Sequence, residues 1–250
     1  MMNTFRQRLE QRDLLIGTLF TLPSPEIAEI LSEAGFDWLW VDMEHSSLEI
    51  KDVQRVLQAV GDKCPCIVRV PSNDEVWIKK VLDIDPAGII VPHVNSAEEV
   101  HKILQFSKYP PEGARSVGIS RAHGYGMKFQ DYVDNANNKM IVIPQIEHID
   151  AVDNIESIVS VPGVAAIVIG PYDLSGSMGK LGNVSDVEVQ QNVEIVKKAC
   201  LNVGLPVGIF GVDADAVRPY IDLGYTLIAV GMDTLFLGKS AQQTIKLLRG

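Results

Sequence analysis

Eight short apolar segments alternate with amphipathic segments along the 250 residues, and this alternation limits the possible folds more than any other sequence feature. The apolar segments, which we expect to be strands, are residues 14–20, 38–41, 66–70, 88–91, 141–146, 164–169, 207–210 and 227–230. Glycine or proline occurs at nearly every joint between a strand and a helix. The pattern predicts an α/β protein with one domain, a (β/α)8 TIM barrel that spans residues 1–250.

A doubly wound open sheet is the alternative fold. Such a sheet usually carries a G-x-G-x-x-G turn after its first strand, where the backbone holds a pyrophosphate. Here the first apolar segment ends in Gly17-Thr18-Leu19-Phe20, which offers no phosphate cradle. The barrel is therefore favoured.

Composition excludes several classes of protein. The net charge of −10 argues against binding to a nucleic-acid backbone, because that interaction depends on Lys and Arg. The first 13 residues are charged throughout and resemble no signal peptide, and no apolar run reaches the length of a membrane span. Three cysteines (Cys64, Cys66, Cys200) cannot all pair, so we expect reduced thiols in a cytoplasmic protein without a membrane partner.

Polar side chains gather at the carboxyl ends of the expected strands, the edge at which barrel enzymes perform chemistry. They are Asp42, Glu44, His45, Arg69, His93, Gln145, Glu147 and Asp173. The last two strands end in apolar or small residues instead, so the polar groups occupy one sector. Clustered ionisable groups suit an enzyme with a small charged substrate better than a purely structural barrel.

Glu147 and Asp173 are the candidate metal ligands. Each carboxylate follows a continuous apolar strand, in Gln145-Ile146-Glu147 and in Gly170-Pro171-Tyr172-Asp173. Two carboxylates that converge at one edge suit a hard divalent cation. In the alternative interpretation, Glu147 merely starts a helix and Asp173 caps a turn.

His45 and Arg69 are the candidate catalytic residues. His45 could exchange a proton near neutral pH, oriented by Asp42, Glu44 or a later acid; the alternative is a surface loop histidine. Arg69 ends an apolar strand, so its buried guanidinium needs a substrate oxygen or a structural acid such as Asp42 or Glu147. Asp83, at a helix end, is either a supporting acid or solvated.

Four other histidines remain. His101 and His148 are expected on helix surfaces, and His93 and His123 carry no assignment.

No lysine lies at a strand end, which argues against a Schiff-base aldolase. The chain also lacks a G-x-S-x-G elbow, a Walker motif, an H-E-x-x-H motif and a glycine-rich phosphate site after the last strands. Residues 107–138 are expected to form a long irregular loop, which is usually functional or mobile.

Four motifs in order resemble the HpcH/HpaI aldolase family, the class II, metal-dependent pyruvate aldolases of the phosphoenolpyruvate/pyruvate barrel superfamily. They are the run from Asp37 to His45, the Val-Arg-Val-Pro of residues 68–71, Gln145-Ile146-Glu147, and the Gly-Pro-Tyr-Asp-Leu-Ser of residues 170–175. The resemblance runs from Gly17 to the last helix.

The resemblance implies roles for individual residues. Glu147 and Asp173 would ligate Mg²⁺, Mn²⁺ or Co²⁺, Arg69 would hold the pyruvyl oxygens, His45 would be the base and Asp83 would partner it. Gln145 and the backbone of Gly170, Pro171 and Tyr172 would line the pyruvate pocket. The implied assembly is a hexamer, a trimer of dimers, in which neighbouring subunits exchange the last helix.

The implied reaction cleaves a 4-hydroxy-2-oxo acid, of the 2-keto-3-deoxy sugar acid or dihydroxy-heptenedioate type, into pyruvate and an aldehyde. Oxaloacetate decarboxylation, CoA-ester lysis and a non-catalytic barrel that binds a small acid are the alternatives. Three departures from the family pattern concern the aldehyde specificity. They are Tyr172 in place of a small residue, Asp85-Pro86 in place of a glycine-containing turn, and an unusual loop at residues 116–128.

Overall fold

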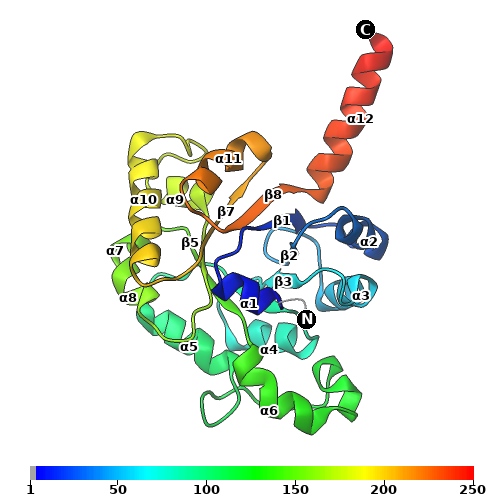
Figure 1. Ribbon diagram of the computed structural model, residues 1–250, viewed down its shortest axis with the longest axis vertical. Coiled ribbons are helices and arrows are strands. Elements are labelled where there is room, and N and C mark those ends of the chain that lie inside the picture. Colours follow the sequence, from blue (N-terminus) through cyan, green and yellow to red (C-terminus); the bar gives the residue numbers. More distant parts are fainter. Residues whose placement is uncertain (1–3) are drawn as a thin grey trace.

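Eight parallel strands form a closed barrel in the computed structural model, which describes residues 4–250 (Figure 1). The strands pair in sequence order, and the last closes on the first with Leu15 opposite Leu227. They are β1 (Leu15–Phe20), β2 (Trp38–Asp42), β3 (Cys66–Arg69), β4 (Gly88–Val91), β5 (Val142–Ile146), β6 (Ile167–Ile169), β7 (Val207–Gly211) and β8 (Leu227–Met232). The predicted TIM barrel is confirmed.

Helices follow the strands along the chain, and most of them cover the outside of the barrel (Figure 1). They are α1 (Phe5–Glu10), α2 (Pro25–Glu33), α3 (Ile50–Val60), α4 (Glu75–Asp83), α5 (Ala97–Ser107), α6 (Phe129–Lys139), α7 (Ile149–Asp153), α8 (Ile155–Val159), α9 (Pro171–Ser177), α10 (Val187–Asn202), α11 (Ala214–Asp222) and α12 (Asp233–Arg249). Most begin at a side-chain cap, such as Asp74 for α4 and Ser96 for α5, which accepts from a free backbone N–H of the first turn.

Apolar side chains form two layers, one inside the barrel and one between the strands and the helices. Strand β2 shows the alternation, since Trp38 and Trp40 lie in the inner cluster while Leu39 and Val41 lie in the outer one. Helix α1 closes the amino end of the barrel, with the Phe5 ring 6.4 Å from the Trp38 ring. Gly17 makes room for that indole, because a Cβ there would stand 2.5 Å from Trp38 Nε1.

Two expectations about local structure are wrong. Residues 107–138 are not a continuous loop, because they contain a short 3-10 segment at Arg121–Gly126 and most of helix α6. Helix α6 is polar and buries only Ala136, so apolar periodicity could not reveal it. The single helix expected at residues 148–159 is divided into α7 and α8 at Asn154.

Helix α12 extends away from the barrel, and Asp233 is its only buried residue (Figure 1). The Asp233 carboxylate anchors its base, since it accepts from the backbone N–H groups of Thr21 and Leu22 at 2.8 Å each. Leu247 and Leu248 near its end are both more than three-quarters exposed. The far end of α12 therefore presents an apolar surface that this chain does not cover.

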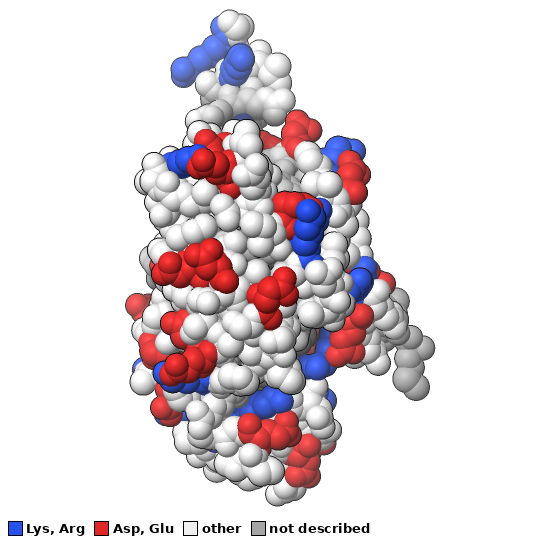
Figure 2. All heavy atoms as spheres, turned by 90° about the vertical axis from the view of Figure 1, so that its left-hand side faces the viewer, with Lys and Arg blue, Asp and Glu red and all other residues white. Residues whose placement is uncertain are grey.

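The charges on one face of the surface are dispersed, and the three cysteines are buried. The face in Figure 2 carries separate acidic groups with Lys and Arg between them, rather than a continuous basic surface. Cys64, Cys66 and Cys200 are free and buried, and burial raises the pKa of Cys64 and of Cys200 to about 12. Among residues 4–250, the helices include none with the length and apolar character needed to cross a membrane.

Candidate active site

A buried ion pair between Asp42 and Arg69 organises the carboxyl edge of the barrel. Asp42 ends β2 and Arg69 ends the neighbouring strand β3, directly opposite in register. The guanidinium donates from Nε and Nη2 to the two oxygens of Asp42, at 2.8 and 2.7 Å, and both side chains are more than nine-tenths buried. Burial alone would lower the pKa of Arg69, but the bond with Asp42 holds that pKa above its usual value.

The third nitrogen of Arg69 faces the centre of the site. Nη1 lies 3.0 Å from Glu44 Oε2 and donates to Gln145 Oε1 at 3.3 Å. The guanidinium also lies over the Trp40 ring, with 5.2 Å between Cζ and the ring centroid. Because Asp42 occupies Nε and Nη2 of the guanidinium, Nη1 is the donor that a bound oxygen can approach.

Asp42 also shapes the turn that carries Glu44 and His45. Its Oδ1 accepts from the backbone N–H groups of Glu44 and His45, at 3.0 and 3.4 Å. The His45 ring is 63% exposed, and its Nε2 lies 3.7 Å from Glu44 Oε2. Of the acids considered from sequence, Glu44 is therefore the one whose side chain approaches the ring, while Asp42 fixes its backbone.

Glu44 and Glu147 form a closely spaced pair of acids. Burial raises the pKa of Glu44, Arg69 opposes that rise and the Glu147 charge adds to it. Oε2 of Glu44 receives no well-directed hydrogen bond from the described residues, although Arg69 Nη1 is near. Gln145 Nε2 donates to Glu147 Oε2, so the Gln145-Ile146-Glu147 motif links Arg69 to Glu147.

His93 follows β4 and lies across these two acids. Its Nε2 is 3.1 Å from Glu44 Oε1, its Nδ1 is 3.4 Å from Glu147 Oε1, and its backbone N–H donates to Glu147 Oε1 at 2.7 Å. Sequence reasoning gave His93 no role, although its place directly after a barrel strand was a usable signal.

A cavity of about 360 Å³ opens beside these groups. It is lined by Arg69, His45 and Gln145 on one side and by Tyr172, Asp173 and Phe210 on the other. Asp173 lies in the first turn of helix α9, which begins at Pro171. Gly170 lets this turn approach β5, because a Cβ there would stand 2.9 Å from both Cβ and Oε2 of Glu147.

Asp83 does not join this group within one chain. Helix α4 runs back along the barrel after β3, so its last residue lies at the amino edge while His45 lies at the carboxyl edge. Asp83 instead accepts from Arg115 Nη2 at 2.8 Å. The partnership with His45 that the family resemblance implied is therefore not made in the single chain.

The unassigned His123 is fully buried near Asp83. Tyr109 Oη lies 3.1 Å from its Nε2 and Ser120 Oγ lies 2.9 Å from its Nδ1. Its ring packs on Phe129 and Tyr132 of helix α6. Burial and the Arg115 charge lower the pKa of His123. Its contacts link Tyr109 and Ser120 to helix α6.

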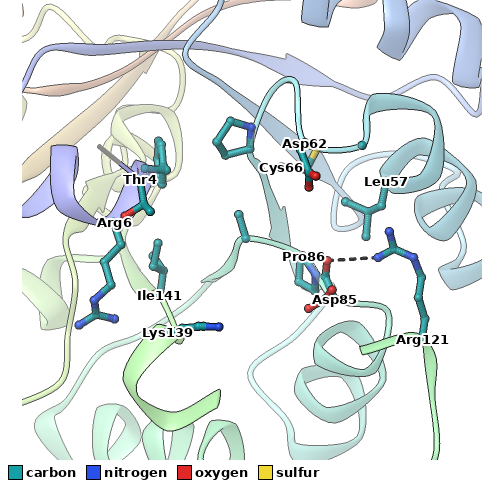
Figure 3. A pocket seen from close by; sticks show the side chains of 14 residues that line it. Thr4, Arg6, Leu57, Asp62, Cys66, Asp85, Pro86, Arg121, Lys139 and Ile141 are labelled. Carbon is teal, nitrogen blue, oxygen red and sulfur yellow. Dashed lines mark hydrogen bonds between the residues drawn. The ribbon is translucent and has the colours of Figure 1, made fainter. Parts of the chain in front are cut away.

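A second hollow, of about 450 Å³, lies at the amino edge of the barrel (Figure 3). Arg6, Lys139 and Arg121 surround it, and Arg121 Nη1 donates to the Asp85 carbonyl at 3.3 Å. Because Cys66 and Ile141, near the starts of their strands, line this hollow, it is separate from the cluster around Arg69.

The donor set at the carboxyl edge fits a divalent cation. Glu44, His93 and Glu147 place one ligand atom each within 4.8 Å of one another. Asp42 and Glu44 face the same guanidinium, and Glu44 Oε2 lacks a directed donor among the described residues. Such an acidic arrangement, with carboxylate and imidazole donors, suits Mg²⁺, Mn²⁺ or Co²⁺.

Comparison with known proteins identifies the family of the chain. The family model described as HpcH/HpaI aldolase/citrate lyase matches residues 16–239. The chain is 37% identical to a 2-dehydro-3,6-dideoxy-6-sulfogluconate aldolase of Pseudomonas putida, over 97% of this chain and 95% of that one. It is 36% identical to a 4-hydroxy-2-oxo-heptane-1,7-dioate aldolase of Shigella sonnei, over 97% of this chain and 93% of that one.

A solved structure extends the match to three dimensions. An HpcH/HpaI aldolase/citrate lyase family protein of Burkholderia cenocepacia superposes with a TM-score of 0.96 at 33% identity, and the match covers all of both chains. The chain therefore belongs to the HpcH/HpaI aldolase/citrate lyase family.

Proposed function

We propose that this protein is a divalent-metal-dependent aldolase that cleaves 4-hydroxy-2-oxo acids to pyruvate and an aldehyde. The observation that carries the proposal is a cavity at the carboxyl edge, where Arg69, His45 and Asp173 line the same space beside Glu147. A carbon–carbon lyase needs a cation for the 2-oxo acid, a base for the hydroxyl proton and a means to stabilise negative charge.

Arg69 binds the pyruvyl part of the substrate in this proposal. Its Nη1 donates to the keto or carboxylate oxygen, while Asp42 holds Nε and Nη2 and fixes the plane of the guanidinium. Gln145 Oε1, which accepts from the same Nη1, restrains the direction of approach. Because the guanidinium is buried, its charge acts on the substrate with little screening by water.

His45 removes the proton from the 4-hydroxyl group. The C3–C4 bond then breaks, the aldehyde leaves, and the electron pair passes to the pyruvyl fragment, whose keto oxygen becomes negative. Arg69 stabilises that charge before C3 takes up a proton. Glu44 Oε2 lies 3.7 Å from His45 Nε2, beside the ring that receives the proton.

Glu147 and Asp173 hold the divalent cation in this proposal. When bound, the cation supplies a positive charge that stabilises the developing oxyanion. Gly170 permits the approach of helix α9 to Glu147 that the two ligands require. The ion is Mg²⁺, Mn²⁺ or Co²⁺, and a small 2-oxo acid and an aldehyde are the partners at the site.

We also propose the hexamer, a trimer of dimers, with helix α12 exchanged between neighbours. The support is that α12 leaves its own barrel with its apolar end uncovered (Figure 1). Light scattering of the full chain and of a variant that ends at Asp233 tests this: the full chain should be hexameric, and the shortened one should be smaller.

The test of the reaction is pyruvate release. The protein is stripped with a chelator, given Mg²⁺, Mn²⁺ or Co²⁺, and offered sugar-derived and aliphatic 4-hydroxy-2-oxo acids. Pyruvate should appear only with metal, and His45→Ala should lose turnover while it keeps metal binding. Glu147→Ala should lose both. Pyruvate release by the stripped protein would contradict the assigned roles of Glu147 and Asp173.

A further inference from the structure

His93 is the residue at the carboxyl edge that the proposed reaction leaves without a role. Its ring spans the gap between two buried carboxylates, with one nitrogen 3.1 Å from Glu44 Oε1 and the other 3.4 Å from Glu147 Oε1. Both acids are less than a tenth exposed, whereas the His93 ring is 62% exposed at the mouth of the site. The exposed ring therefore lies across a buried pair of acids.

The backbone of His93 is arranged to reach Glu147. Its φ of +55° lies in the left-handed region, which residues with a Cβ rarely adopt. In this conformation the backbone N–H donates to Glu147 Oε1 at 2.7 Å and the ring turns back over the same oxygen. A strained residue that converges twice on one carboxylate oxygen indicates a positioned side chain rather than an ordinary loop residue.

The three side chains form a compact donor set. One atom each from Glu44, His93 and Glu147 lie within 4.8 Å of one another, which places all three within reach of one ion. Asp173 is not a member of this set, so it would contribute from the side of helix α9. The donor set differs from a pair of acids because it contains an imidazole nitrogen, and nitrogen donors favour later first-row ions over Mg²⁺.

We propose that His93 supplies an imidazole nitrogen to the divalent cation, beside the carboxylates of Glu44 and Glu147. The inference rests on the metal site of the proposed function and adds Glu44 and His93 to its ligands. Among the ions of the proposed function, a nitrogen ligand favours Co²⁺ over Mg²⁺. The ring nitrogen that does not bind the ion keeps its contact with a carboxylate, as metal-bound histidines usually do.

The test compares the wild type with His93→Asn, because Asn tolerates a left-handed backbone but has no imidazole. His101→Asn, which changes an exposed histidine on helix α5, is the matched control. Mn²⁺ is bound to each protein, and pulsed electron paramagnetic resonance detects the ¹⁴N coupling of a coordinated imidazole. The coupling should be present in the wild type and in His101→Asn and absent from His93→Asn.

Titration with metal ions provides a second readout. His93→Asn should weaken Co²⁺ and Zn²⁺ binding by at least about tenfold and Mg²⁺ binding by much less, since Mg²⁺ depends little on nitrogen donors. Circular dichroism checks folding, and His93→Gln replaces His93→Asn if the latter unfolds. A ¹⁴N coupling that survives in the folded variant, an equal loss for Mg²⁺ and Co²⁺, or no ion bound by the wild type would overturn the proposal.

The result separates this inference from the proposed function. A wild type that releases pyruvate with metal but shows no ¹⁴N coupling would remove His93 from the ligand set and leave the aldolase intact. A wild type with the coupling but without pyruvate release would keep the ligand and refute the aldolase.

Discussion

Replacement of Asp42 by Asn tests the ion pair on which the site is built. The change keeps the shape of the side chain but removes the charge opposite Arg69, which is only 7% exposed at its side chain. The guanidinium then retains Glu44, 3.0 Å from Nη1, but loses the anion that accepts from Nε and Nη2. The protein should therefore fold less stably and bind a substrate oxygen less well.

The size of the loss follows from burial. Breaking a buried ion pair by removing one partner costs about 3–5 kcal/mol. Because Glu44 still faces Arg69, we expect the lower end, about 3 kcal/mol. In a chain of this size that corresponds to a fall in Tm of roughly 6–12 °C.

The assay is thermal unfolding at several protein concentrations, since assembly also contributes to the apparent stability. Asp13→Asn is the matched control, because Asp13 meets Arg8 at 3.4 Å on the exposed surface, where an ion pair contributes little. Asp42→Asn with Arg69→Met should lose less than the sum of the single variants, because the double variant leaves no buried unpaired guanidinium. Equal Tm values for Asp42→Asn and Asp13→Asn would refute the reasoning.

Three further results are expected. Gly170→Ala should lower pyruvate release at least about tenfold and the free energy of unfolding by about 1–3 kcal/mol, because the new Cβ meets Glu147. The control is Gly238→Ala on α12, where the new Cβ meets nothing within 4 Å. Equal activity of the two variants would contradict this prediction. The pKa of His123 is lower in the folded protein than in the unfolded chain, so the unfolded chain binds more protons and the folded state loses stability as pH falls below about 6.5. Thermal scans from about pH 7.5 to 5.5 should therefore show a smaller fall in Tm for His123→Gln than for the wild type. Identical falls in Tm would contradict this prediction. Added Mn²⁺ should raise the Tm of the chelator-treated protein but not that of Glu147→Ala, and an equal rise in both would place the ion elsewhere.

Much of the fold could be predicted because every barrel strand is buried on both sides. Continuous apolar runs such as the one before Glu147 are the direct product of that burial. Helix α6 could not be predicted, because it packs through the His123 ring and one buried alanine rather than through an apolar stripe. The break at Asn154 between α7 and α8 also leaves no periodic signal.

The role of a site residue could be predicted where it follows from the position of that residue along a strand. Arg69 at the end of an apolar strand required an acid, and Asp42, one of the two acids considered, is its partner. His93 was placed at this edge but left without a role, because the backbone conformation that turns its ring back over Glu147 has no sequence signature. Asp83 was placed with His45 by family resemblance, whereas within one chain the return of helix α4 carries it to the other edge.

The central claim is that the carboxyl edge of this barrel stabilises negative charge on the pyruvyl group. Hydrogen exchange at C3 of pyruvate is its most direct test. Pyruvate is incubated in D₂O with chelator-treated protein, with and without added Mg²⁺, and deuterium at the methyl group is followed by mass spectrometry. We expect exchange that requires the metal and that is lost in Arg69→Met and in Glu147→Ala. Equal exchange with and without metal, or exchange that persists in both variants, would contradict the account.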